Sequence, residues 1–425
     1  MGRTETAFPA TTNTKTPATV EQESLDGRKS LRAPSLFKRV VLLILDSVGC
    51  GGAPDAAAYG DAGADTLGNI ARAVGGLSLP NLQRFGLGNA ARVDGVPPSP
   101  EPAGAVGRMR EASVGKDTTT GHWELAGLRI ADSFATFPAG FPTTIIDELA
   151  SRVGRGVIGN KAASGTEILR ELGSEHLRTG KLIVYTSIDS VFQIAAHEDV
   201  VPLDELYDIC RTAREILDPW RVGRVIARPF VGEDGSSFRR TYHRRDLSMP
   251  PPAPTVLDCI AASGIPVVGV GKIGDIYAGH GITEEIHTEG NRDGMERTIG
   301  VLERVPAGLI VANLVDFDTL YGHRNDFLGY ARCLAELDSL LPALEEKLTP
   351  DDMLVITADH GNDPTTPGTD HTREEVPLLV CGPSVVPGVQ LGTRATFADV
   401  GATLAEVFAV SSPSCGTSFL EEVTR

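Results

Sequence analysis

Three largely apolar runs, each leading into acidic residues, constrain the fold more than any other feature. The runs cover residues 40–45, 308–315 and 353–357, and the acids that follow them include Asp46, Asp318 and Asp359. Such a run is typical of a strand buried on both faces, as in a parallel α/β sheet. Ligands of these sheets bind outside the carboxyl ends of the strands. The sequence therefore predicts an α/β fold with a mostly parallel sheet and acids gathered at one edge.

Helical patterns follow these runs. Residues 329–348 and 397–408 have helical apolar spacing, and residues 265–271 read as another core strand. The alternation of strand and helix predicts a doubly wound sheet flanked by helices.

The middle of the chain has a different pattern. Residues 130–260 read as helix, helix, strand, helix and strand, followed by the proline-rich linker 250–254. We interpret this region as a smaller α+β cap domain inserted into the sheet domain. The predicted division is a disordered tail over 1–37, a first core part over 38–129, the cap over 130–255 and a second core part over 256–425.

Charge and apolar run length exclude several classes of protein. The chain has 425 residues and 56 acidic against 39 basic side chains, a net charge of −17. This balance disfavours a general nucleic-acid binder or a protein of membrane surfaces. The longest apolar run, residues 40–45, is far shorter than the ~20 residues of a membrane-spanning helix. The six scattered cysteines contain no CxxC pair, so we expect buried thiols, no cysteine-based zinc site and a cytoplasmic location.

Aspartates and histidines cluster after the three predicted strands. Mixed carboxylate and imidazole ligands suit Mn, Zn or Fe better than Ca. A lone aspartate can cap a helix and a lone histidine can sit in a loop, but a set spread over three strand ends favours two metals. Three carboxylates would repel a phosphate, and two divalent cations would offset that charge. The set is Asp46, Asp318, His323, Asp359, His360 and His371.

A threonine-rich loop is the second chemical signal. Residues 115–124 read Gly-Lys-Asp-Thr-Thr-Thr-Gly-His-Trp-Glu. Metal coordination is one way to activate a threonine hydroxyl as a nucleophile. A polar turn that caps a helix explains the same residues equally well.

Three strings identify a family resemblance. They are Val-Gly-Lys-Asp-Thr-Thr-Thr-Gly-His-Trp-Glu from Val114, Asp-Phe-Asp-Thr-Leu-Tyr-Gly-His-Arg from Asp316 and Thr-Ala-Asp-His-Gly-Asn-Asp-Pro from Thr357. These strings resemble phosphopentomutases, which belong to the alkaline phosphatase superfamily of two-metal enzymes. The resemblance covers residues 38–423. It implies an alkaline-phosphatase-like core with a mobile cap, two Mn²⁺ ions or other divalent transition metals, and a phosphorylated threonine.

The resemblance also implies roles for individual residues. Thr118 matches the phosphate acceptor of the family. One metal would be held by Asp46, Asp359 and His360, and the other by Asp318, His323 and His371.

Residues 186–191 resemble the segment of the family that contacts the sugar. Ser187 and Asp189 would bind sugar hydroxyls, although Asp189 equally suits a turn. Arg224 and Lys272 resemble phosphate-contacting positions, and either could instead be a surface charge. Further candidates of the same kind are Asn160, Lys161 and Arg228.

The resemblance implies interconversion of the 1-phosphate and 5-phosphate of ribose or 2-deoxyribose. The reaction would use a phosphothreonine enzyme, a 1,5-bisphosphate intermediate and a sugar bisphosphate as primer. The alternatives are a metal-dependent phosphatase, another phosphomutase such as a cofactor-independent phosphoglycerate mutase, and a metal-binding protein without catalysis. The expected partner is a small phosphosugar, with no nucleic acid and no membrane. The number of subunits is not predicted.

Overall fold

The computed structural model describes Gly2 and residues 36–187, 190–411 and 415–424. Nearly all of the predicted tail, residues 1–37, lies outside the described residues, and so does Asp189. Within the described ranges, no helix has both the length and the apolar character needed to cross a bilayer.

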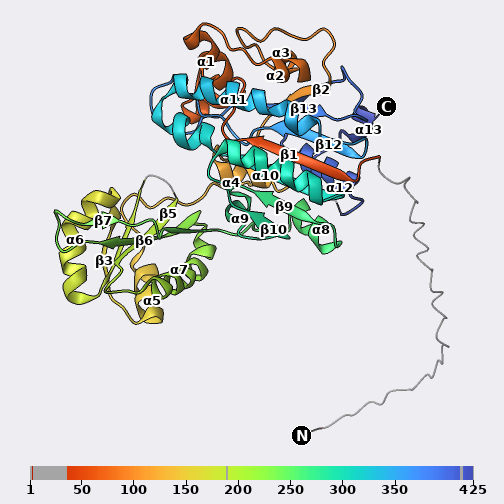
Figure 1. Ribbon diagram of the computed structural model, residues 1–425. Helices are drawn as coiled ribbons and strands as arrows, with labels where there is room; N and C mark the ends of the chain where they lie inside the picture. Colours follow the sequence, from red (N-terminus) through yellow and green to blue (C-terminus); the bar gives the residue numbers. More distant parts are fainter. Residues whose placement is uncertain (1, 3–35, 188–189, 412–414, 425) are drawn as a thin grey trace. The chain divides into compact units, whose positions relative to one another are not determined.

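Eight strands form the first sheet. They are β1 (Arg39–Leu45), β2 (Ala105–Met109), β9 (Val267–Val270), β10 (Glu284–Ile286), β11 (Gly308–Leu314), β12 (Asp352–Thr357), β13 (Val376–Cys381) and β14 (Gln390–Arg394). Their order is β10-β9-β11-β1-β12-β13-β2-β14 (Figure 1). β13 is antiparallel to β12 and β2, and all other neighbours are parallel. The predicted mostly parallel α/β sheet is confirmed.

β1 lies in the middle of this sheet, between β11 and β12. Its seven residues are all buried, as expected for a strand covered on both faces. Arg39 pairs with Gly308 of β11 and with Asp352 of β12. The Arg39 guanidinium also donates to both carboxylate oxygens of Asp352, at 2.7 and 2.6 Å. This buried ion pair ties the start of β1 to a strand that is distant in the sequence.

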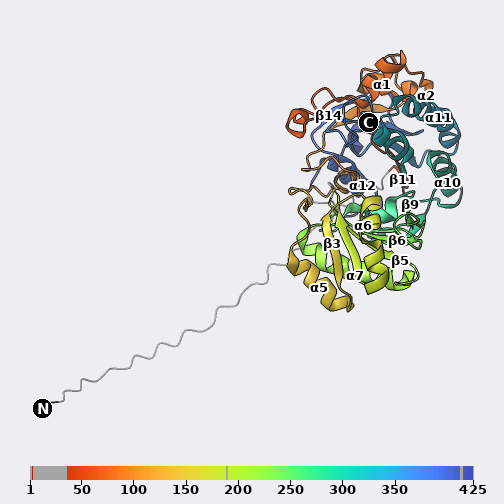
Figure 2. The same ribbon diagram turned by 90° about the vertical axis from the view of Figure 1, so that its left-hand side faces the viewer.

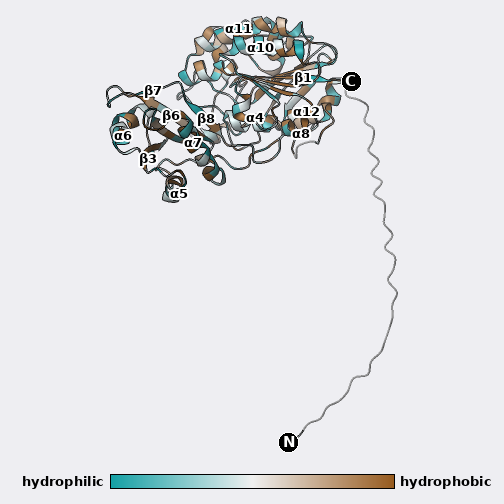
Figure 3. Cartoon of the chain, turned by 60° about the horizontal axis from the view of Figure 1, so that its bottom comes forward, coloured by the Kyte–Doolittle hydropathy of each residue, from teal (hydrophilic) through white to brown (hydrophobic). Residues whose placement is uncertain are grey.

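Helices cover both faces of the first sheet, and its strands are largely hydrophobic (Figure 3). One face carries α1 (Thr66–Val74), α2 (Pro80–Phe85), α10 (Asn291–Arg304) and α11 (Phe327–Glu345) (Figure 1). The other carries α4 (Thr118–Leu125), α8 (Val256–Ala262), α9 (Ile273–Ile276) and α12 (Ala398–Val407). The predicted helices 329–348 and 397–408 correspond to α11 and α12. Short helices α3 (Leu87–Ala90) and α13 (Leu420–Thr424) complete this part.

A second sheet is built from the middle of the chain. Its strands are β3 (Val157–Ala162), β4 (Leu182–Thr186), β5 (Val191–His197), β6 (Arg224–Val231), β7 (Arg239–Arg240) and β8 (Arg245–Ser248). The order is β3-β4-β5-β6-β7, and β8 also pairs with β6. Helices α5 (Thr143–Val153) and α7 (Leu203–Leu217) share one apolar cluster with it, and α6 (Gly165–Thr179) shares another (Figure 2). The domain boundaries at 130 and 255 stay a prediction.

The sequence pattern missed four strands of this sheet, namely β3, β5 and the short strands β7 and β8. β3 contains Gly159 and Asn160, both at positive φ, and its pairing with β4 shifts register there. β5 ends in Ala195, Ala196 and His197, and alanine favours helices over strands. The predicted order of helices and strands for residues 130–260 is therefore incomplete.

Candidate metal centre

Three neighbouring strands of the first sheet deliver the predicted acids to one edge. Leu45 of β1 is paired with Leu314 of β11, and Ile44 with Thr357 of β12. Asp46 directly follows β1, and Asp359 follows β12 by two residues. Because parallel strands end at the same edge, these acids meet those that follow β11.

Asp46, Asp359 and His360 form one compact group. One ligand atom from each lies within 4.8 Å of the others, and all three residues are buried. The Nε2 atom of His360 is 3.4 Å from Asp46 Oδ1 and 3.4 Å from Asp359 Oδ2. The structure thus brings together the first predicted set of ligands.

A second group lies around Asp318, within the helical turn Phe317–Tyr321. Asp318, His360 and His371 place ligand atoms within 4.8 Å of one another. His323 Nε2 is 3.1 Å from Asp318 Oδ2, and the His323 and His371 rings are 4.8 Å apart. His323 therefore lies beside this group, and His360 is shared by both groups.

The donor atoms fit bound metal ions. Asp46 Oδ1, Asp359 Oδ2 and His371 Nε2 are buried and accept no hydrogen bond, an arrangement that costs free energy unless a cation occupies the space between them. His323 Nδ1 donates to the Thr369 carbonyl at 2.5 Å, and His360 Nδ1 donates to the Gly361 carbonyl at 3.0 Å. Both histidines consequently turn Nε2 toward the carboxylates, as metal-ligating histidines do.

The electrostatics of the groups also point to cations. Burial and the nearby Asp359 carboxylate raise the pKa of Asp46. Burial raises the pKa of Asp318 as well, but the His323 and His371 rings beside its carboxylate outweigh this effect and hold the pKa well below the usual value. Burial lowers the pKa of His360, but the nearby Asp359 and Asp46 carboxylates outweigh this effect and raise the pKa well above its ordinary value. The carboxylates need positive charge, which the histidines supply only when protonated.

Each aspartate also has one oxygen occupied by a protein donor. Asn313 Nδ2 donates to Asp46 Oδ2 at 3.1 Å, and Asn362 Nδ2 donates to Asp318 Oδ1 at 2.8 Å. The third donor is the backbone N–H of Ser47, which lies 3.1 Å from Asp359 Oδ1 and has a φ of 74°. A left-handed non-glycine residue carries backbone strain, and such strain concentrates at functional sites.

Thr118 is the first residue of α4, and its hydroxyl reaches the candidate metal centre. Its Oγ1 atom lies 3.1 Å from His360 Nε2. Thr120 Oγ1 instead donates to the carbonyl and carboxylate of Asp117, at 3.0 and 2.9 Å. Asp117 caps α4 by accepting from the backbone N–H groups of Thr119 and Thr120. The helix-cap interpretation therefore applies to Asp117, whereas the hydroxyl of Thr118 contacts His360.

Two buried charged residues hold the segment that leads into α4. Glu124 accepts from the backbone N–H groups of Ala112 and Ser113, at 2.8 and 2.6 Å. Arg373, which is 3% exposed, donates to the carbonyls of Ser113 and Gly115 at 2.9 and 2.5 Å. Since Arg373 follows His371 by two residues, it joins the ligand-bearing segment to the threonine loop.

Arg373 also pairs with acids. Its guanidinium donates to the buried Glu111 at 2.7 Å and to Asp55 at 3.1 Å. Burial raises the pKa of Glu111 well above the ordinary value, and the Arg373 charge opposes that shift.

Glu374 lies beside Gly361, the residue that follows His360. It is buried and accepts from the N–H and hydroxyl of Thr66, at 2.9 and 2.6 Å, and from the Thr372 hydroxyl at 2.7 Å. The Thr66 hydroxyl in turn accepts from the Asn362 N–H at 3.2 Å. Burial raises the pKa of Glu374 to about 7. Sequence reasoning missed Asn313, Asn362, Arg373 and Glu374.

Comparisons with known proteins agree with this geometry. A family model described as the metalloenzyme superfamily matches residues 38–412. A protein of Anaeromyxobacter dehalogenans named phosphopentomutase is 63% identical over 389 residues, which cover 91% of this chain and 99% of that protein. The chain belongs to the phosphopentomutase family. It is therefore an enzyme of a metal-dependent superfamily, as the resemblance implied.

Further relatives extend the phosphopentomutase family match. The phosphopentomutase of Symbiobacterium thermophilum is 57% identical over 390 residues, which cover 91% of this chain and 99% of that protein. Among solved structures, the phosphoglycerate mutase of Leishmania mexicana covers 92% of this chain and 98% of its own, with 13% identity and a TM-score of 0.46.

The predicted substrate residues of this phosphopentomutase family member lie on separate elements. Ser187 follows β4, Arg224 begins β6 and Lys272 precedes α9. Arg224 is 3.9 Å from Asp246. Among the described residues, no hydrogen bond or ion pair joins Ser187, Arg224 or Lys272 to Thr118 or to the candidate ligands.

The further phosphate candidates have protein partners. Asn160 exchanges hydrogen bonds with the backbone of Phe141, and Lys161 pairs with Glu171 at 2.7 Å. Arg228 donates to Gln193 at 3.0 Å. Burial and the charges of Arg244 and Arg240 lower the pKa of Arg228. The second sheet therefore carries a concentration of positive charge within an acidic chain.

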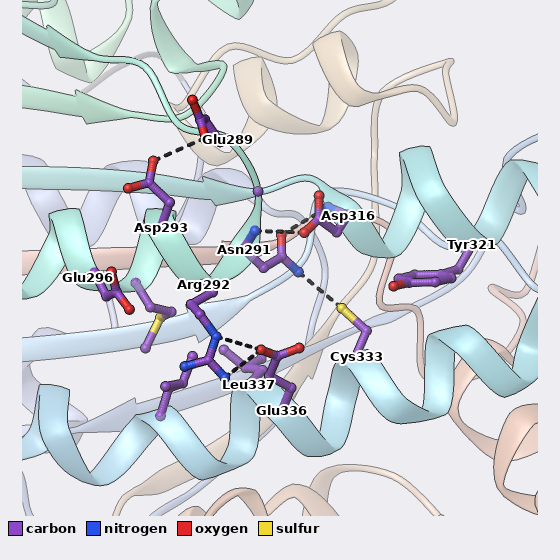
Figure 4. Close-up of a pocket in the computed structure, with 13 residues that line it drawn as sticks. Glu289, Asn291, Arg292, Asp293, Glu296, Asp316, Tyr321, Cys333, Glu336 and Leu337 are labelled. Carbon is purple, nitrogen blue, oxygen red and sulfur yellow. Dashed lines mark hydrogen bonds and ion pairs between the residues drawn. The ribbon is translucent and has the colours of Figure 1, made fainter.

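A cavity of about 300 Å³ near the carboxyl end of β11 is not suited to a phosphosugar (Figure 4). Asp316 lies in its wall, where it accepts from the Asn291 N–H at 2.7 Å and donates its own N–H to Asn291 Oδ1 at 2.9 Å. The one basic residue of the lining, Arg292, is paired with Glu336 at 2.6 Å. Such a lining repels anions. Its acidic residues are Glu289, Asp293, Glu296, Asp316 and Glu336.

Proposed function

We propose that this chain interconverts the 1-phosphate and 5-phosphate of ribose or 2-deoxyribose through a phosphorylated Thr118. The observation that carries the proposal is the 3.1 Å distance from Thr118 Oγ1 to His360 Nε2, because His360 belongs to both candidate ligand groups. The names of the relatives support the choice of pentose phosphates.

In the proposed reaction, phosphorylated Thr118 gives its phosphoryl group to the free hydroxyl of the sugar monophosphate. The bond between phosphorus and Thr118 oxygen breaks, a bond to the sugar oxygen forms, and the sugar hydroxyl loses its proton while Thr118 regains one. The resulting 1,5-bisphosphate turns over and returns its other phosphoryl group to Thr118. A sugar 1,6-bisphosphate would prime the threonine.

Two divalent cations, for which we propose Mn²⁺, would supply the positive charge that stabilises the transferring phosphoryl oxygens. Asp46, Asp359 and His360 would hold one ion, and the other ligand set is Asp318, His323 and His371. The unpartnered buried oxygens of Asp46 and Asp359 support this assignment.

We assign the sugar hydroxyls to Ser187 and Asp189, and the phosphate remote from Thr118 to Arg224 and Lys272. A guanidinium binds phosphate through two parallel hydrogen bonds, and an ammonium binds it as a point charge. The cap, residues 130–255, excludes water, so that transfer to the sugar outruns hydrolysis. Four buried thiols, those of Cys50, Cys210, Cys333 and Cys381, support a cytoplasmic location.

The test is to incubate the Mn²⁺-loaded protein with glucose 1,6-bisphosphate and to map the modified residue by mass spectrometry. We expect phosphate on Thr118 and conversion of ribose 5-phosphate to the 1-phosphate. Phosphate on Thr119 or Thr120 would move the nucleophile, and release of free phosphate as the main product would make the chain a phosphatase.

A further inference from the structure

Two buried asparagines connect the candidate ligand groups, each lying in the segment of one group and donating to an aspartate of the other. Asn313 is in β11, the strand that leads to Asp318, but its side chain donates to Asp46 of the other group at 3.1 Å. Asn362 follows Asp359 and His360, but its side chain donates to Asp318 at 2.8 Å. We propose that Asn313 and Asn362 are positioning residues that fix the two ligand groups relative to each other.

A carboxamide suits this task chemically. Its N–H donates to one carboxylate oxygen without adding charge, and it has no ionisable proton to lose near neutral pH. The bonded oxygen is occupied, so each aspartate offers its other oxygen to a metal ion. Asp46 shows this division, because Oδ2 accepts from Asn313 while the buried Oδ1 has no hydrogen-bond partner. Hydrogen bonds of this kind orient metal ligands.

Asn313 is poorly explained by a purely structural role. It is 2% exposed, and its Oδ1 atom is buried without a hydrogen-bond partner. A buried carbonyl oxygen without a partner destabilises the folded chain. Exchanging its amide atoms would turn an oxygen toward the Asp46 carboxylate, which would be repulsive. Within the described residues, the one hydrogen bond of this side chain is thus the bond to a candidate ligand.

Hydrogen bonds to buried residues fix the backbone of Asn362. Its backbone N–H donates to the Thr66 hydroxyl at 3.2 Å, and that hydroxyl donates to Glu374 at 2.6 Å. The side chain is 1% exposed. Because the backbone of Asn362 is fixed, its amide transmits the position of the Asp359–His360 segment to Asp318.

This inference rests on the proposed two-metal function, and its test measures metal binding directly. The metal-free full chain is titrated with Mn²⁺, and free Mn²⁺ is followed by electron paramagnetic resonance. We expect two Mn²⁺ per wild-type chain, and Asn313→Leu and Asn362→Leu should each weaken both binding events by about 10–100-fold. Asn89→Leu is the matched control, since Asn89 exchanges hydrogen bonds with Ser99 and touches no candidate ligand.

The outcomes distinguish the positioning role of the asparagines from the proposed two-metal function. Unchanged affinities in both asparagine variants, with two ions in the wild type, overturn the positioning role alone. A loss confined to one binding event per variant overturns the connection between the groups. A wild-type chain that binds no Mn²⁺ overturns the two-metal function and this inference together. If a leucine variant fails to fold by circular dichroism, Asn313→Ser and Asn362→Ser replace it, because serine is polar but too short to reach the aspartate.

Discussion

The hydroxyl of Thr118 lies 3.1 Å from Nε2 of His360, a residue 242 positions away in the chain. The helix cap explains why Thr118, and not its neighbours, takes this position. Asp117 holds the N–H groups of Thr119 and Thr120 and the hydroxyl of Thr120. Thr118, at the first helical position, is left facing the histidine shared by both candidate ligand groups.

Replacing Thr118 by valine should abolish mutase activity, because no other hydroxyl of the loop contacts a candidate ligand. We expect a loss of more than about 10³-fold in kcat, typical of removing a nucleophile. Thr120→Val is the matched control. It removes hydrogen bonds to Asp117 worth about 1 kcal/mol each and should retain most activity. Coupled assay of ribose 5-phosphate formation measures both, and an active Thr118→Val enzyme would contradict the assignment.

Removing divalent metal should abolish activity and lower thermal stability. The three buried aspartates then lack the cations that offset their charge, and a ligand that binds only the folded state stabilises it. We expect exhaustive EDTA treatment to inactivate the enzyme and Mn²⁺ to restore it better than Mg²⁺ or Ca²⁺. Full activity in a preparation that elemental analysis shows to be metal-free would rule out the two-metal mechanism.

Glu374→Gln should change how stability depends on pH. The pKa of Glu374 is about 7 in the folded chain against an ordinary value of 4.5. Because the folded-state pKa is raised, the associated stability is present below pH 4.5 and is lost as pH rises through about 7. Relative to Glu374→Gln, the wild type should lose about 3 kcal/mol across this interval. Urea unfolding of the metal-free proteins at several pH values measures the difference, and a constant difference would show that folding does not raise the pKa of Glu374.

Arg373→Met should destabilise the chain by about 3–5 kcal/mol, the cost of breaking a buried ion pair from one side. The change leaves Glu111 buried without its cation and frees the carbonyls of Ser113 and Gly115. The double variant Arg373→Met/Glu111→Gln should recover part of the loss, since no buried carboxylate is then left without its cation. Chemical denaturation of the Mn²⁺-loaded proteins compares them. A double variant less stable than Arg373→Met would contradict the role given to the pair.

The edge of the sheet where the candidate site forms can be predicted from the sequence. An apolar run marks a buried strand, and the acids after it mark the end of that strand. Parallel strands such as β1 and β12 end together, so Asp46 and Asp359 could be expected to meet. The assignment of His323 and His371 to one metal came from the family resemblance, since both lie in irregular segments whose course no periodicity encodes.

The supporting residues could not be predicted in the same way. Asn313 lies inside an apolar run and is 267 positions from its partner Asp46. In the sequence, nothing distinguishes Arg373 from any other charged residue near a strand, because its carbonyl partners are known only from the structure. Hydrogen bonds between distant segments leave no local pattern in the sequence. β3 was missed for another reason, because Gly159 and Asn160 interrupt its strand pattern.

The central place of β1 has a consequence for synthesis. Its first residue pairs with Gly308 and Asp352, so a ribosome must add most of the polypeptide before this strand finds a neighbour on either side. Contacts of such long sequence separation form slowly. The histidine shared by both candidate ligand groups is itself made late, so under the two-metal proposal a nascent chain lacks a ligand of both sites. On that proposal, metal loading is a final step, reserved for molecules whose synthesis has run nearly to its end.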